Sequence, residues 1–326
     1  MATLRQLSNL NGSARGQAAL GTVLEQALVM RFLEQNSGFE LDATSFDYLP
    51  VSGTDNLQTR AIGNGFTATA KTPPARQNGT LAIYGDAVTI DRSHLADAAA
   101  GLRDIDRWLE REMQKRVRST AKGLDGALMN GAGTGTTMKG LSKILNGTDD
   151  IPGLTGVKGV GDAATFKSTG THKSLDLTDA ANYPYFIEGL INELMKVDNV
   201  AGIVMNHQLY ARMYTIARKE AILGESRDLF GRPVATFNGV PMVPVDATSI
   251  PNDEPDNTST PLTVTTSLYI ASPAEMGLSV VTNEGLYYKE FDQLEAKVSS
   301  QEVYELRMAW KIEDDRVVRR VRNLKV

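Results

Sequence analysis

The longest regular pattern of apolar positions in the chain lies between residues 102 and 130. Apolar residues recur there at three- and four-residue steps, which is the spacing of one face of an α-helix. The pattern predicts a helix from about Arg103 to Asn130, roughly 42 Å long at 1.5 Å per residue. Its charges complement the helix dipole, because acidic residues come early and basic residues late. The apolar face consists of Leu102, Ile105, Leu109, Met113, Val117, Ala121, Leu124 and Leu128.

Shorter patterns predict the elements on either side. A helical pattern runs from about Ser13 to Gln35. After the long helix, one further helix is expected to begin near Thr178 and another to cover "HQLYARMYTIARKE", with the buried strand "VAGIVMN" between them. "LFGRPVATFNGVPMVPVD" predicts two short strands about an Asn-Gly turn, and "SLYIASPAEMGLSVVTNEGLYYKE" predicts more strands. Strict alternation from Tyr304 to Ile312 predicts a strand that forms a terminal β-hairpin with "RVVRRVRNL".

Two stretches lack a helical period. Residues 41–91 are rich in Gly, Thr, Asn and Pro, and we expect an extended hairpin there, with Pro73 and Pro74 barring a central strand and Asn78-Gly79 forming a turn. A flat polar segment of this kind cannot build a core of its own, so it is expected either to be mobile or to grip a partner. Residues 146–174 are dense in Gly, Thr and Asp, and we expect an inserted loop.

Composition narrows the class of protein. The chain has 326 residues, 41% hydrophobic and 22% charged, which is ordinary for a globular protein. A net charge of -5 gives no bulk electrostatic reason to bind nucleic acid or an anionic membrane. Cysteine is absent, which excludes disulfides and thiolate chemistry. The beginning of the chain lacks the apolar core of a signal peptide, so we expect a cytosolic protein without a membrane partner.

The stretch "NGAGTGTTMKG", residues 130–140, could be taken for a phosphate-binding loop. Phosphate-binding glycine motifs follow a strand and begin a helix, whereas these glycines follow a predicted helix, whose carbonyl end repels phosphate. The segment also matches neither motif in full: GxGxxG would need a glycine at Thr136, and the Walker motif needs Gly-Lys followed by Ser or Thr, where this chain has "MKG". We therefore expect a helix stop, with Asn130 and Gly131 supplying the left-handed residue typical of helix ends.

No other motif indicates catalysis or metal binding. The three histidines, His94, His172 and His207, fall in separate elements, and "NDEPDN" near Asn252 lacks the spacing of a calcium loop. The basic run "RVVRRVRNLK" has no interleaved aromatic residues, so we expect a strand with solvated or ion-paired arginines rather than a nucleic-acid contact. The sequence predicts no catalytic residue, no cofactor and no metal.

The order of elements resembles that of the major capsid proteins of tailed bacteriophages, the Hong Kong 97 fold shared with encapsulins. The resemblance rests on the segment at the end of the long helix, "DGALMNGAGTGTTMKGL", and on "GIVMNHQLYARM". It also rests on the Gly-x-Pro-Val motif of the family, which is present here as Gly231, Pro233 and Val234. The Met-Pro pair that follows it in the family appears in altered order, as Pro241, Met242 and Pro244. It covers nearly the whole chain.

The resemblance implies an α+β fold and a division of the chain. It implies an N-terminal arm (1–50), an E-loop (51–93), a P-domain with a spine helix and an inserted loop (94–174), an A-domain (175–283), and P-domain strands that return to the A-domain (284–326). The arm and the loop are then expected to find apolar partners only on neighbouring copies.

The resemblance also implies a function. Such a protein would assemble as pentamers and hexamers into an icosahedral shell around packaged DNA, without sequence-specific DNA binding, in the cytoplasm of a host bacterium, with portal, scaffolding and decoration proteins as further partners. Some family members cross-link a loop lysine to an asparagine of another copy, and Lys71 lies in that loop, although an ordinary surface lysine is the preferred interpretation. An encapsulin shell and a nucleotide-binding α/β enzyme remain the alternatives.

Overall fold

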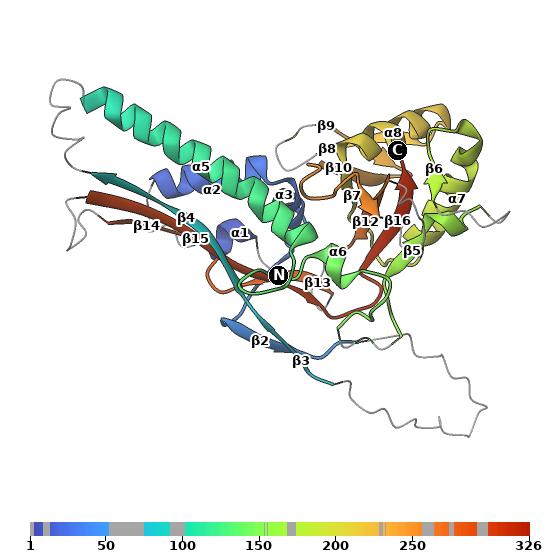
Figure 1. Cartoon of the computed structure of the whole chain (residues 1–326), viewed down its shortest axis with the longest axis horizontal. Helices are drawn as coiled ribbons and strands as arrows, with labels where there is room; N and C mark the ends of the chain where they lie inside the picture. The colour runs from blue at the N-terminus through green and yellow to red at the C-terminus, as the bar shows by residue number, and fades with distance from the viewer. Residues whose placement is uncertain are drawn as a thin grey trace, which may run out of the picture.

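The computed structural model describes residues 3–8, 14–51, 75–91, 102–152, 154, 156–167, 174–227, 231, 233–255, 264–273, 277–291 and 299–326. The molecule is elongated, with a lobe built on a long helix and a long sheet and a second lobe in which helices cover another sheet (Figure 1). One large hydrophobic core lies within the second lobe, while a larger one fills the first lobe and extends onto the sheet of the second, so apolar contacts join the two lobes. We call them the helix lobe and the sheet lobe.

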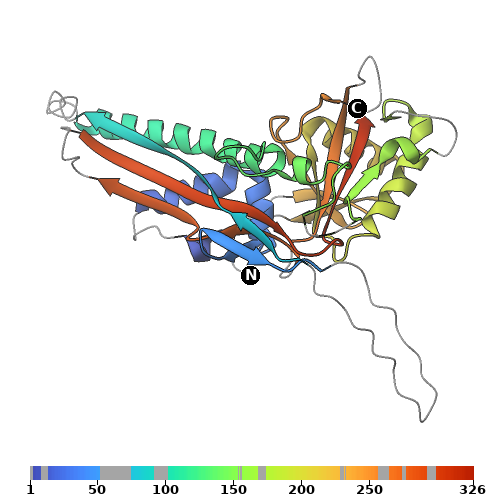
Figure 2. The same cartoon turned by 60° about the horizontal axis from the view of Figure 1, so that its bottom comes forward.

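The long helix α5 (Leu102–Asn130) confirms the prediction from the apolar pattern. Its predicted inner face is buried at every position where the side chain is described, namely Met113, Val117, Ala121, Leu124 and Leu128. Figure 2 shows α5 along the upper edge of the helix lobe, with the long strands below it. The helix ends at Asn130, where the next amide, that of Gly131, still donates to the carbonyl of Ala127 at 3.0 Å.

The sheet beneath α5 is antiparallel around one long central strand. Strand β15 (Ser299–Ile312) pairs with β4 (Ala82–Asp91) on one side and with β14 (Leu286–Phe291) and β13 (Leu278–Thr282) on the other, and β1 (Phe39–Leu41) pairs in parallel with β13. The predicted alternation is confirmed from Tyr304 to Met308, but it does not continue to Ile312, because Ala309 and Lys311 are buried as well. Polar contacts fix this face to α5: the Trp310 Nε1 donates to the Leu128 carbonyl at 2.7 Å.

The N-terminal helices pack against this same core. They are α1 (Leu4–Leu7), α2 (Ala14–Gln26) and α3 (Leu28–Gln35). The helical pattern over residues 13–35 is therefore confirmed, with a break at Ala27. The expectation that the arm finds apolar partners only on other copies is wrong for these helices, since their apolar residues join α5 and β14 in one cluster. The buried ones are Leu4, Leu20, Val23, Leu24, Val29, Met30, Phe32 and Leu33.

The sheet lobe is a mixed sheet with helices α7 (Tyr183–Leu194) and α8 (His207–Lys219) on one face. Its strands lie in the order β5 (Val160–Asp162), β16 (Val318–Lys325), β12 (Val264–Ala271), β7 (Gly202–Asn206), β10 (Val240–Val245), β9 (Pro233–Phe237) and β8 (Leu223–Arg227). The short strands β6 (Leu175–Asp176) and β11 (Glu254–Pro255) pair with β16 and β12. Strand β7 is buried throughout, as predicted, and positive φ angles at Asn238 and Gly239 confirm the expected turn.

Several expectations are wrong. The C-terminal strands form no hairpin with each other: β15 and β16 belong to different sheets. Residues 146–174 are not a plain loop, because β5 pairs in parallel with β16. The helix expected from near Thr178 begins at Tyr183, after a short 3-10 turn at Ala180–Asn182.

The expected Asn78-Gly79 turn is instead part of a strand. Strand β3 (Gln77–Thr80) pairs with β2 (Ser45–Tyr48), and Gly79 stands opposite Phe46. A Cβ on Gly79 would lie 2.4 Å from the Phe46 ring, so glycine is needed here for close approach of the ring and not for a reversal of the chain. Residues 52–74, which β2 and β3 flank, lie outside the described residues.

Burial of Leu124, which is 1% exposed, generates a stability prediction. Leu124→Asp should abolish the soluble chain, because it places an unpaired charge in the core between α5 and its neighbours. Gln114→Asp on the exposed face of the same helix should leave solubility and the circular dichroism spectrum unchanged. Equal loss of soluble protein in both variants would contradict this account. Leu109, a second position of the predicted face, has an undescribed side chain.

Candidate assembly surfaces

Apolar side chains that the described part of the chain leaves exposed lie around strands β2 and β3. Leu41, Leu49, Val51 and Ile83 are between 47% and 58% exposed. The backbone that carries them is nevertheless fixed, since the Val51 amide donates to the Glu313 carbonyl at 2.5 Å and the Leu81 amide donates to the Thr44 carbonyl at 3.1 Å. Apolar surface held on an ordered backbone is typical of a contact region between proteins. We call this region, residues 41–51 and 75–83, the loop base.

A pocket of about 330 Å³ separates the loop base from the glycine segment after α5. Its aromatic part is ordered, because the Phe46 and Tyr48 rings stack with centroids 6.2 Å apart. The pocket is lined in part by Phe46, Tyr48, Met138, Lys139, Trp310 and Ile312. The pocket therefore combines apolar and aromatic side chains and one cation with polar residues, namely Gln77, Asn78, Thr80 and Thr137.

The glycine segment itself is a tight backbone turn. Ala132 and Lys139 form an antiparallel bridge, the Gly133 amide donates to the Met138 carbonyl at 3.1 Å, and the Gly140 amide donates to the Gly131 carbonyl at 3.0 Å. These amides are therefore occupied by carbonyls and cannot cradle a phosphate. The helix stop is confirmed, but the left-handed residues are Gly133 and Gly135 rather than Asn130 or Gly131.

Two buried carboxylates fasten the N-terminal helices. Asp125, 5% exposed on α5, accepts the amides of Leu28 at 2.5 Å, Val29 at 3.1 Å and Met30 at 3.2 Å, and so caps α3, whose own N-cap residue Ala27 makes no side-chain bond. Burial raises the pKa of Asp125 to about 7, and the three amide donors limit the rise.

The second carboxylate repeats this arrangement one helix further on. Glu34 of α3, 4% exposed, accepts the amide of Leu4 at the start of α1, and burial raises its pKa. The Arg5 side chain lies 3.8 Å from Glu34 and remains half-exposed. The chain of fastenings thus runs from α5 to α3 to α1. Sequence analysis missed both residues. Asp125 lies four residues after Ala121, at the edge of the predicted apolar face of α5, where a carboxylate is a signal of a specific polar partner.

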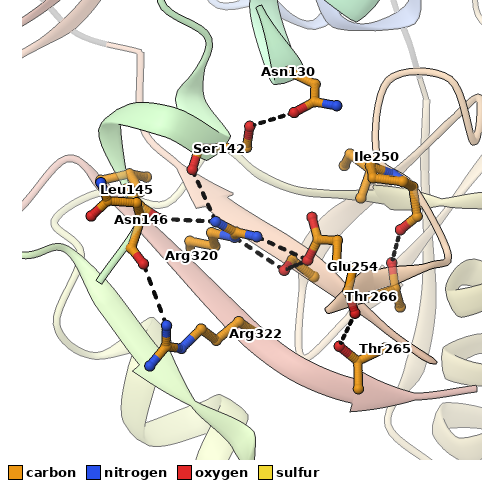
Figure 3. Close-up of polar contacts among 12 residues, drawn as sticks. Asn130, Ser142, Leu145, Asn146, Ile250, Glu254, Thr265, Thr266, Arg320 and Arg322 are labelled. Atoms are coloured by element: carbon orange, nitrogen blue, oxygen red, sulfur yellow. Dashed lines mark hydrogen bonds and ion pairs between the residues drawn. The ribbon is translucent and has the colours of Figure 1, made fainter. Parts of the chain in front are cut away.

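A polar network joins the two lobes around Arg320 of β16 (Figure 3). Its guanidinium donates to the carbonyls of Ser142 at 3.0 Å and Leu145 at 3.1 Å and to the Ser267 hydroxyl at 3.0 Å, and it lies 2.9 Å from the Glu254 carboxylate. Both charged side chains are about nine-tenths buried. The network ties the segment after α5 to the sheet lobe, because Ser142 belongs to the short helix α6 (Leu141–Ile144) and Leu145 is its C-cap.

The neighbouring basic residues of the C-terminal run are also paired. Arg316 lies 2.7 Å from Asp198, Arg319 lies 2.6 Å from Glu193, and Lys325 lies 2.7 Å from Asp176. The expected strand with ion-paired arginines is therefore confirmed, and Val317 and Val321 are buried as expected.

Other predicted candidates do not come together. His207 is an exposed residue at the start of α8, while His94, His172 and Lys71 lie outside the described residues. Across the part of the chain that the structure describes, no three His, Asp or Glu residues are arranged to hold a metal ion. None of the described helices is long and apolar enough to cross a membrane.

Comparison with known proteins identifies the fold. The sequence matches no protein-family model and no curated protein. The structure is similar to the holo-SrpI encapsulin complex from Synechococcus elongatus, with a TM-score of 0.56 and 15% identity over 90% of this chain and 88% of that chain. It is also similar to the capsid of a native GTA particle, with a TM-score of 0.54 and 18% identity over 91% and 90% of the two chains.

The chain has the Hong Kong 97 capsid fold. The mature capsid of bacteriophage PhiM1 shares this capsid fold, with a TM-score of 0.50 and 11% identity over 88% of this chain and 85% of that chain. Because the matched share is large in both directions, the capsid fold includes both lobes described above.

The buried Asp125 generates a prediction about pH. Its pKa is raised in the folded chain from 3.8 to about 7, so the folded chain binds a proton that the unfolded chain releases between these values. This contribution to stability is complete below about pH 4 and is lost as the pH rises through about 7. The free energy of unfolding of the wild type minus that of Asp125→Asn should therefore fall from pH 5 to pH 7 and then level off. Chemical denaturation at each pH measures this difference, and a rising difference would contradict the prediction.

The buried ion pair at the lobe junction generates a second prediction. Arg320→Met should lower the free energy of unfolding by about 3–5 kcal/mol, because it leaves the Glu254 carboxylate buried without its charged partner. Arg320→Met combined with Glu254→Leu should cost less than the sum of the two single substitutions. Denaturant unfolding of the four chains completes the cycle, and strict additivity would show that the two side chains do not depend on each other.

Proposed function

We propose that this chain is the major capsid protein of a tailed bacteriophage. The observation that carries the proposal is the capsid fold. The likeness to the GTA capsid chain covers 91% of this chain, including both lobes, and 90% of that chain. The exposed apolar loop base supports it, because a subunit that holds such surface on a fixed backbone gains stability by covering it with another copy.

In this proposal the chain assembles with itself into pentamers and hexamers that close as an icosahedral shell. The shell encloses the DNA genome in the virion, and assembly takes place in the cytoplasm of the host bacterium, with portal, scaffolding and decoration proteins as further partners. The domain division stays as the resemblance implies it: arm 1–50, E-loop 51–93, P-domain 94–174, A-domain 175–283, and returning strands 284–326.

We propose a structural and not a catalytic role. The enzyme alternative depended on the glycine segment, and the amides of Gly133 and Gly140 are already bonded to backbone carbonyls. A nucleotide would have to displace these bonds and meet the carbonyl end of α5. Cross-linking through Lys71 is not part of the proposal, and a single-chain band from mature particles on a denaturing gel would agree with that.

An encapsulin-type shell is the second candidate, and its basis is the likeness to the encapsulin of Synechococcus elongatus. The two functions differ in what the shell encloses. Genes for a portal protein and a terminase beside the gene for this chain would favour the phage capsid, whereas a gene for a cargo enzyme would favour the encapsulin.

The proposal predicts that the purified chain, alone or with its scaffolding protein, forms hollow particles of megadalton mass. Size-exclusion chromatography with negative-stain microscopy measures this, and a chain that remains a compact monomer under both conditions would contradict the proposal. Arg76→Glu in the loop base should leave the circular dichroism spectrum unchanged and reduce the yield of particles.

A charge exchange serves as the matched control for that variant. Arg76 lies 3.5 Å from Asp47 within the chain, and both side chains are more than half exposed. Arg76→Glu combined with Asp47→Arg restores this pair but not a contact of Arg76 with another copy. The yield of particles should therefore stay low in the double variant, and recovery to the wild-type yield would show that Arg76 acts only within its own chain.

A further inference from the structure

Four basic side chains form a row along the exposed face of α5. Arg111, Lys115, Arg118 and Lys122 follow one another at steps of four, three and four residues, which places them on one side of the helix. All are exposed, and they span about 16 Å at 1.5 Å per residue. We call this row the basic stripe. It lies on a different side of the helix from the buried face that contains Val117 and Leu124.

The basic stripe is only weakly neutralised by the chain. Lys115 lies 3.9 Å from Glu112, which also pairs with Arg116 at 3.4 Å, and Lys122 lies 3.7 Å from Asp246. These are long contacts of highly exposed lysines, which contribute little and are screened by salt. Among the described residues, Arg111 and Arg118 form no ion pair. The stripe therefore keeps most of its positive charge, in contrast to the C-terminal arginines.

The surface beside the stripe allows a large, stiff partner to approach. A Cβ built on Gly123 would meet no atom within 4 Å, and one on Gly126 would meet only the Thr248 carbonyl, at 3.8 Å. Figure 2 shows α5 at the upper edge of the helix lobe, with the described strands and helices of that lobe below it. A straight row of cations on a helix face that no described element covers suits a partner whose negative charges also repeat along a line.

We infer that the basic stripe binds the phosphate backbone of double-stranded nucleic acid and so defines the face of the subunit that turns toward the packaged genome. This inference rests on the proposed capsid function for the identity of the nucleic acid. Duplex DNA carries one negative charge per about 1.7 Å of its axis, so a 16 Å row of four cations meets several phosphates regardless of base sequence. The whole chain has a net charge of -5, so the chain without the four cations of the stripe has a net charge of -9. This negative charge disfavours contact of DNA with other faces of the subunit.

The test measures how the binding of duplex DNA depends on salt. Fluorescence anisotropy of a labelled short duplex is recorded with the full-length chain after particles have been removed by ultracentrifugation. The variant is Arg111→Gln with Arg118→Gln. The matched control is Lys158→Gln with Arg218→Gln, which removes the same charge from exposed positions of the sheet lobe. Circular dichroism shows whether each chain is folded.

Binding by the wild type is expected at low salt, with a plot of log affinity against log salt whose slope the stripe variant reduces by about two. Between about 50 and 200 mM salt, the wild type should lose about ten-fold more affinity than the stripe variant. The control should keep the wild-type slope. Absence of binding by the wild type at low salt, or an equal change in the control, would overturn the inference.

Two further outcomes distinguish this inference from a general affinity for acidic chains and from the capsid proposal. If polyglutamate of equal charge displaces the duplex as well as unlabelled DNA does, the stripe recognises acidic chains in general and the assignment to nucleic acid is wrong. Particle formation is scored separately by microscopy. If particles form normally and the stripe variant keeps the full salt slope, the inference is refuted and the capsid proposal stands. If the wild type forms no particles, the result counts against the capsid proposal and not against the DNA contact.

Discussion

The structure of the helix lobe depends on the burial of one face of α5. This face lies between the long antiparallel sheet and the N-terminal helices, so a single helix supplies apolar surface to two neighbours at once. Removal of that surface from water is the largest favourable contribution available to such a lobe, at roughly 25 cal/mol for each Å² of apolar area. Two hydrogen bonds fix the position of β15 along the helix: Trp310 donates to the Leu128 carbonyl, and the Thr120 and Tyr304 hydroxyls lie 2.9 Å apart.

Buried polar groups in this apolar core hold particular helices and strands together through hydrogen bonds of specific geometry. Asp125 and Glu34 are helix caps supplied by a different helix, and each satisfies amides that would otherwise be buried without an acceptor. Arg320 has the same role between the lobes, since it pairs with Glu254 and also donates to the carbonyls of Ser142 and Leu145 at α6. Such groups add little net stability compared with apolar residues, but they permit few alternative arrangements.

Local pattern predicted most elements and little of how they connect in space. The periodicity of residues 102–130 predicted α5 to within one residue, because the signal repeats many times within one element. The alternation from Tyr304 to Ile312 predicted the end of β15, but the strand begins five residues earlier, at Ser299. The partner of a strand leaves no such signal. The C-terminal strand was assigned to a hairpin because adjacent strands usually pair, and the structure places β15 and β16 in different sheets. Gly79 was taken for a turn residue because its role, to admit the Phe46 ring, involves a residue more than thirty positions away. The caps at Asp125 and Glu34 depend on equally distant amides.

The passage of the chain from β15 to β16 has a mechanical consequence. Residues 313–317 cross from one sheet to the other, and so does the segment between β12 and β13. The two crossings are bonded to each other, since the Ser272 amide donates to the Val317 carbonyl and the Glu313 amide donates to the Gly277 carbonyl, both at 2.8 Å. Because each crossing is continuous backbone and the two are hydrogen-bonded at two points, a displacement of one lobe is passed to the other through this junction.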